Sequence, residues 1–142
     1  MSTIPSLPSS RYSLTANLPG VPYDEAVARS RAALGDEGFG VLTEIDVQAT
    51  LLKKLGAATR PYIILGACNP ALAHRALQAE PVIGVLLPCN VVVAADDDGG
   101  SVVSAVDPVA MFEVVGRPDI APLALEVRER LERVLRAVQA AR

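Results

Sequence analysis

Each of the two cysteines in the chain is followed by asparagine and has a proline within two residues. The first pair stands in Ala67-Cys68-Asn69-Pro70 and the second in Pro88-Cys89-Asn90. Asparagine followed by proline favours the start of a helix, because the amide caps the first turn and proline fits the first helical position. The positive end of that helix favours a thiolate just before it and offers free N–H groups to an anionic ligand. Cys68 is therefore the candidate nucleophile.

A second interpretation gives the cysteines no chemistry, since free cysteine is commonly a small buried residue. Cys89 falls on the same strand face as Val91 and Val93, which points it towards the core. If the strands that carry the two cysteines are antiparallel neighbours, Cys89 lies close enough to Cys68 to act as a resolving thiol. A register shift of four residues would instead separate them by roughly 13 Å. Cys68 and Cys89 are the candidate catalytic residues.

His74, the only histidine, follows Cys68 in the same predicted helix, on the flank of its apolar stripe. Two cysteines and one histidine fall short of a four-ligand zinc site, and no Cys-x-x-Cys spacing occurs. The sequence therefore predicts no metal and no cofactor. The candidate ligand-binding residues are Cys68, Asn69, His74 and Asn90. No phosphate loop, nucleophile elbow or dinucleotide fingerprint accompanies them.

Hydrophobic periodicity and turn residues predict the elements that must position these residues. Strands are expected over 11–18, 39–45, 62–68, 84–95 and 101–106, and helices over 22–35, 47–55, 70–79, 108–112 and 120–140. In the short helix after Asp46, Val47, Leu51 and Leu55 lie at i, i+4 and i+8, and Gly56 is expected to close the helix in the left-handed conformation. Residues 1–9 hold two prolines and three serines and are expected to form a flexible arm before one domain over 10–142.

Composition narrows the class of protein. A net charge of −3 and a pI of about 5.1 leave no basic stripe for nucleic acid. The longest apolar stretch, 82–95, is too short and interrupted for a membrane span, and the first residues lack a secretory signal. A cytoplasmic protein is therefore expected. A hydrophobic fraction of 51% with only 4% aromatic residues predicts an aliphatic core and, since the fraction is high, a homodimer interface.

Three segments together resemble a known family. They are Ile64 to Pro70, Ala73-His74-Arg75-Ala76-Leu77, and Gly84 to Val93, with both Cys-Asn pairs inside them. The chain resembles the bacterial and archaeal family catalogued as domain of unknown function 302 from about Pro22 to Asp107. The resemblance implies a TATA-binding-protein-like α+β fold in the order β-α-β-β-β-β-α. It further implies a bent antiparallel sheet with long helices on one face, and usually a homodimer.

The resemblance implies no activity, and a fold shared with a DNA-binding protein does not imply DNA binding. The leading hypothesis is a dimeric module that binds a small ligand or a partner at the Cys68-Asn69-Pro70 helix start. An alternative is a thiol enzyme, or a sulfur or redox protein, that uses Cys68 with Cys89. A further alternative is a structural or assembly partner whose dimer surface is its function.

Overall fold

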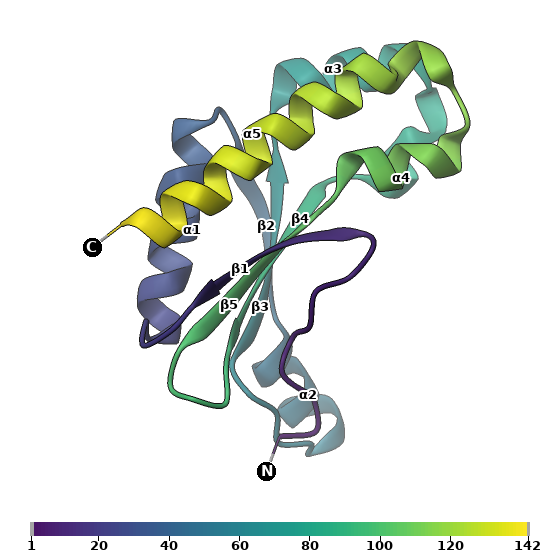
Figure 1. The fold of residues 1–142 in the computed structure, drawn as a ribbon. Coiled ribbons are helices and arrows are strands. Elements are labelled where there is room, and N and C mark those ends of the chain that lie inside the picture. The colour runs from purple at the N-terminus through teal and green to yellow at the C-terminus, as the bar shows by residue number, and fades with distance from the viewer. Residues whose placement is uncertain (1, 142) are drawn as a thin grey trace.

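The computed structural model describes residues 2–141 as strands and helices arranged around one antiparallel sheet (Figure 1). The strands are β1 (Ser13–Leu18), β2 (Gly40–Asp46), β3 (Tyr62–Cys68), β4 (Cys89–Ala95) and β5 (Ser101–Val106). They lie in the order β1-β5-β4-β3-β2, and every neighbouring pair is antiparallel. The α+β fold and the order of its elements are as predicted.

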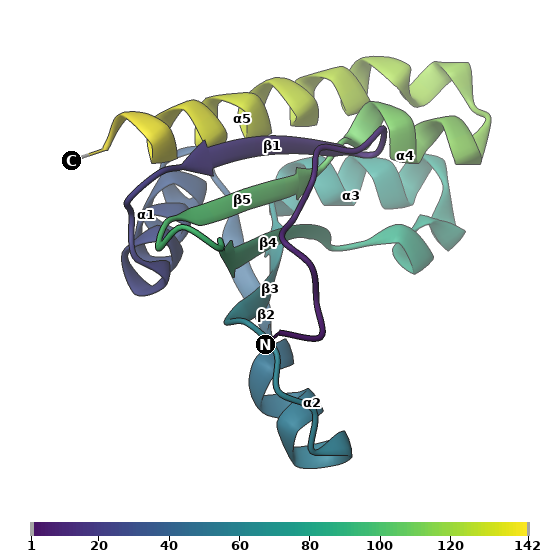
Figure 2. The same cartoon turned by 60° about the horizontal axis from the view of Figure 1, so that its bottom comes forward.

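Two long helices cover one face of this sheet. They are α1 (Tyr23–Asp36) and α5 (Ala121–Ala140), which also pack against each other. Figure 2 shows α5 running along β1. The shorter helices are α2 (Val47–Leu55), α3 (Pro70–Ala79) and α4 (Pro108–Val115), with 3-10 turns at Pro81–Leu86 and Pro118–Ile120. Within the described residues no helix is both long and apolar enough to cross a membrane.

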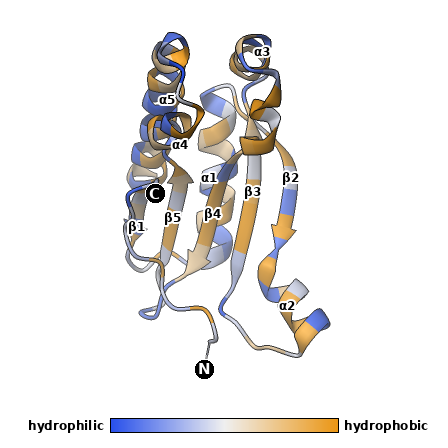
Figure 3. Cartoon of the chain, turned by 90° about the vertical axis from the view of Figure 1, so that its right-hand side faces the viewer, coloured by the Kyte–Doolittle hydropathy of each residue, from blue (hydrophilic) through white to orange (hydrophobic). Residues whose placement is uncertain are grey.

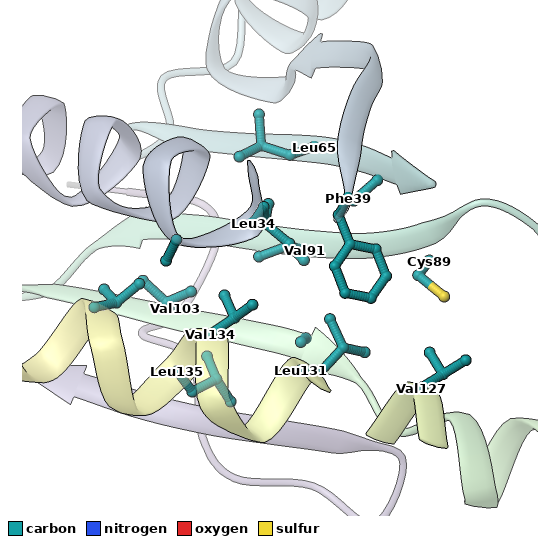
Figure 4. Packing of buried hydrophobic residues seen from close by; sticks show 14 of the residues in the cluster. Leu34, Phe39, Leu65, Cys89, Val91, Val103, Val127, Leu131, Val134 and Leu135 are labelled. Atoms are coloured by element: carbon teal, nitrogen blue, oxygen red, sulfur yellow. The ribbon is translucent and has the colours of Figure 1, made fainter. Parts of the chain in front are cut away.

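The core lies between the sheet and these two helices, and its side chains are mostly aliphatic. Leu34 of α1, Leu65 of β3 and Leu131 of α5 are fully buried there (Figure 4). Strand β4 contributes Val91 and Val93, and β5 contributes Val103 and Ala105. The two residues of each pair are two positions apart, as the period of two along a strand requires. Burial of this apolar surface supplies the main driving force for the fold.

Three short helices begin at the side-chain caps that the sequence predicts. The carboxylate of Asp46 accepts from Ala49 N, and the amide oxygen of Asn69 accepts from Leu72 N. Asp107 caps α4 in the same way. Each cap satisfies an N–H group that the first turn would otherwise leave unpaired, so each helix starts where its cap stands.

The fourth strand is shorter than predicted. A strand was expected from Gly84, whereas β4 begins at Cys89 and Pro81–Leu86 forms a 3-10 turn. Pro88 follows that turn through a cis peptide bond. Since proline has no N–H to donate to a neighbouring strand, ladder pairing starts only after it. An apolar run alone does not distinguish a strand from a 3-10 turn, and in this turn only Ile83 is buried.

The apolar residues of α2 are not part of the core. The helix forms as predicted and ends at Gly56 in the left-handed conformation, but none of its side chains is buried. Leu55 is 75% exposed and Leu52 is 58% exposed. The main contacts of the helix are with the adjoining strands β2 and β3, and they leave its apolar residues uncovered.

Residues 2–6 are hydrogen bonded to the far end of the sheet. Ser2 Oγ accepts from Arg60 N, Ile4 O accepts from Arg60 Nε, and Ser6 Oγ donates to Asp96. Arg60 also donates to Ala95 O and pairs with Asp97. Met1 lies outside the described residues, and the flexibility of segment 1–9 stays a prediction.

Candidate functional site

A cavity of about 270 Å³ opens where β3 ends and β4 begins. Helix α3 forms one of its walls, and α4 with the first turns of α5 forms another. Figure 3 shows these helices on two sides of the strand ends. Fourteen of its eighteen lining residues are apolar in side chain, and the other four are Thr43, Cys68, Asn69 and Cys89. The cavity therefore combines an apolar wall with a few polar groups, which is the usual composition of a small-molecule site.

Strand register brings the two cysteines to this cavity. In the β3–β4 ladder Cys89 pairs with Ala67, which is the residue directly before Cys68. The two cysteines are therefore one residue out of register. Cys68 is partly exposed and Cys89 is buried, and both are free thiols. The shift of four residues considered from the sequence is therefore absent, and both thiols line one site.

Helix α3 supplies the wall next to Cys68. Asn69 Oδ1 caps the helix at 3.3 Å from Leu72 N, and Asn69 itself lines the cavity. Ala73 and Ala76 follow along the same helix face. Leu77 is 39% exposed and also lines the cavity. Small alanine side chains in the middle of this wall leave the space that the cavity occupies.

The opposite wall comes from α4 and the first turns of α5. Met111 and Phe112 of α4 line it together with Leu123 and Val127 of α5. Figure 4 shows Val127 on the side of the core where Cys89 lies. These residues are distant in sequence from the Cys-Asn pairs, so packing of the two helices alone places them at the site.

Strand β2 forms another part of the cavity lining through a bulge. The pairing with β3 shifts between Val41 and Thr43, so Leu42 is an extra residue on β2. Leu42 is 68% exposed and lines the cavity with Thr43. A bulge turns side chains away from the regular alternation, and here it directs Leu42 and Thr43 to the site.

Burial governs the chemistry of Cys89. It raises the pKa of the Cys89 thiol from 9.0 to about 11, and the nearby Cys68 adds to that increase. A thiol in an apolar environment resists ionisation because the thiolate loses its hydration. Cys89 is therefore a neutral thiol at physiological pH.

We expect Cys68 to react with iodoacetamide long before Cys89 does. At pH 8 the Cys89 thiol, with its pKa of about 11, carries about 100-fold less thiolate than it would at its ordinary pKa of 9.0. Mass spectrometry of the intact chain, with Cys68→Ala and Cys89→Ala to assign each label, measures the two rates. Both cysteines should react alike in denaturant, and equal rates in the folded chain would contradict the burial of Cys89.

Two predicted ligand-binding residues lie outside this cavity. Asn90 is exposed and lines a second pocket, of about 340 Å³, on the other face of the sheet, with Tyr12, Tyr62 and Ser104. His74 is exposed on α3 and lines neither pocket. Alternation along β4 explains the separation, because successive side chains point to opposite faces and Cys89 takes the buried one. The structure thus brings together Cys68, Asn69 and Cys89.

Comparison with known proteins places this arrangement in a family. The family model described as domain of unknown function DUF302 matches residues 14–138. The chain belongs to the DUF302 family. It is also similar to a crystal structure of an uncharacterised conserved DUF302 protein from Bacillus stearothermophilus, with 28% identity and a TM-score of 0.84. That match covers 91% of this chain and 99% of the other. A search of the curated proteins gave no match.

The sequence did not predict that residues of α4, α5 and β2 line the cavity of this DUF302 domain. Met111 and Phe112 were assigned only to a short helix, and Thr43 only to a strand. One signal was available: α4 is apolar at most of its positions, which is unusual for a short helix at the surface. Such a helix must bury more than one face or border an apolar cavity.

The donor set of this DUF302 domain is poor in metal ligands. Among residues 2–141, no three His, Cys, Asp or Glu side chains stand together in a group able to hold a metal ion. The cavity offers two thiols, one amide and one hydroxyl. Its walls are better suited to excluding water from an organic ligand than to coordinating a metal.

Proposed function

We propose that this DUF302 chain is a module that binds a small ligand in the cavity at the Cys68-Asn69-Pro70 helix start. The observation that carries the proposal is a cavity of about 270 Å³ with largely apolar walls beside the capped start of α3. A pocket of this size can enclose most of a small molecule, and a few polar groups in its lining can orient it. The net charge of −3 favours such a ligand over nucleic acid.

Filling the cavity should abolish binding. Ala73→Leu adds three carbon atoms to the α3 wall, while alanine and leucine have similar helix propensities. We expect the affinity for the uncharged dye N-phenyl-1-naphthylamine to fall about tenfold or more, which corresponds to about 1.4 kcal/mol. Fluorescence titration of the folded chain measures the dye affinity.

The matched control is Ala71→Leu on the same helix. Ala71 is exposed and does not line the cavity, so this variant should bind the dye as the parent chain does. Thermal unfolding of both variants shows whether the helix is intact. Equal dye affinity of the two variants, or no binding by the parent chain, would refute the proposed site.

A thiol-dependent reaction is the second candidate function. It is supported by the position of Cys68 and Cys89 at one cavity, with Cys68 the more exposed of the two. Cys68 would be the nucleophile, because Cys89 is held as a neutral thiol by burial. A Cys68 alkylation rate no faster than that of free cysteine would argue against this function.

We further propose a homodimer, with α2 and the edge strand β2 at the interface. Ile45, Leu52 and Leu55 expose apolar surface on these two adjoining elements, and α2 has no buried side chain. Light scattering should give about twice the chain mass of 14.9 kDa. Leu55→Lys should shift the mass to the monomer, while Leu125→Lys on the exposed side of α5 should not. A parent chain that stays monomeric would contradict the interface.

A further inference from the structure

The lining of the cavity contains no charged side chain. Among the described residues, the polar groups in its wall are one hydroxyl, one amide and two thiols, from Thr43, Asn69, Cys68 and Cys89. Moving a charge from water into apolar surroundings is costly unless a partner compensates it. No side chain in the wall supplies a compensating charge, and the buried Cys89 thiol is itself neutral. The enclosed part of a ligand must therefore be uncharged.

The volume of the cavity limits the size of that enclosed part. A cavity of about 150 Å³ with aliphatic and aromatic walls takes up benzene, which has six carbon atoms. In proportion, the cavity of about 270 Å³ holds roughly ten carbon atoms. Phe112 and Cys89 are buried and form its inner wall, whereas Leu42 and Thr43 are exposed. A ligand would enter from the exposed side and place its apolar end against Phe112.

One polar group in the cavity wall has unused donor capacity. Asn69 Oδ1 accepts from Leu72 N, but Asn69 Nδ2 forms no hydrogen bond with any described residue. Asn69 is partly exposed and lies beside Cys68, so its amide N–H₂ is free to donate to a ligand oxygen. Such a bond would hold the polar end of the ligand near solvent.

We propose that the cavity binds an uncharged amphiphile with an apolar body of about ten carbons. The polar end of this ligand accepts a hydrogen bond from Asn69 Nδ2. The inference rests on the proposed small-ligand function and adds the chemical class of the ligand. The observations behind it are the lack of charge in the wall, the volume, and the free amide donor beside the capped helix start.

A chain-length series tests this class. Straight-chain alcohols from butanol to dodecanol would compete with N-phenyl-1-naphthylamine on the full chain. Burial of each methylene is expected to raise the affinity about fourfold. The gain should continue to about ten carbons and then stop, because further carbons remain outside the cavity. In Ala73→Leu the affinity should stop increasing at a chain about three carbons shorter. In Ala71→Leu the chain length at which the affinity stops increasing should be the same as in the parent chain.

The polar end is tested by Asn69→Ser, since serine keeps a good helix cap but removes the amide donor. We expect alcohol affinity to fall about fivefold while the gain per methylene is unchanged. Unchanged affinity would overturn the role of Asn69 Nδ2. Dye binding without any dependence on alcohol chain length, or without a limit near ten carbons, would overturn the ligand class alone. Failure of the dye to bind the parent chain would overturn the proposed function as well.

Discussion

Gly66→Ala should destabilise the fold by about 3 kcal/mol, because this position of β3 has no room for a methyl group. A Cβ there would overlap Thr43 Oγ1 and lie 2.9 Å from Pro88 Cγ. Both neighbours line the cavity, and the Pro88 ring has little freedom to move away. The substitution should therefore also lower dye affinity. Chemical denaturation measures the free energy of unfolding.

Two further variants show whether Gly66→Ala lowers the free energy of unfolding through steric conflict or through a general effect of replacing glycine by alanine. In a Thr43→Ala background the Gly66→Ala change should cost less, because the Oγ1 overlap is gone while the Pro88 contact remains. Gly35→Ala in α1 meets no atom within 4 Å and should stabilise the chain by about 0.5–1 kcal/mol. An equal cost of Gly66→Ala in both backgrounds would show that Thr43 does not set the limit at this position.

Leu131→Ala should cost about 3–5 kcal/mol of unfolding free energy. Leu131 is 0% exposed at the centre of α5, between the helix and the sheet (Figure 4). Removal of its side chain forfeits apolar burial and leaves a void that a close-packed core fills only in part. The same helix carries Leu123 and Val127 of the cavity wall, so its packing also positions the site.

The matched control for this prediction is Leu125→Ala on the same helix. Leu125 is 51% exposed, so the same chemical change should cost well under 1 kcal/mol. Denaturation midpoints and slopes for both variants give the comparison. A small cost for Leu131→Ala would mean that α5 is not packed on the sheet as described.

Local signals in the sequence were sufficient for the helix starts. Asp46, Asn69 and Asp107 cap helices where predicted, since capping depends on a side chain and an N–H group two or three residues away. The long helices were also predictable, because the apolar stripe of α5 repeats over several turns and all of it is buried. The predicted and observed elements differed most where an apolar run had neither a capping residue nor a helical period. At Pro81–Leu86 a strand was predicted and a 3-10 turn is observed.

The sequence by itself therefore determined the elements, the fold class and the two thiol-asparagine pairs. Only the tertiary structure decided which of these residues share a site. It joined Cys68, Asn69 and Cys89 and separated them from Asn90 and His74. The reason is that register, the bulge at Leu42 and the packing of α4 and α5 are contacts between distant parts of the chain. A shift of one residue in strand pairing turns every side chain to the other face, and no local pattern around Cys68 encodes that choice.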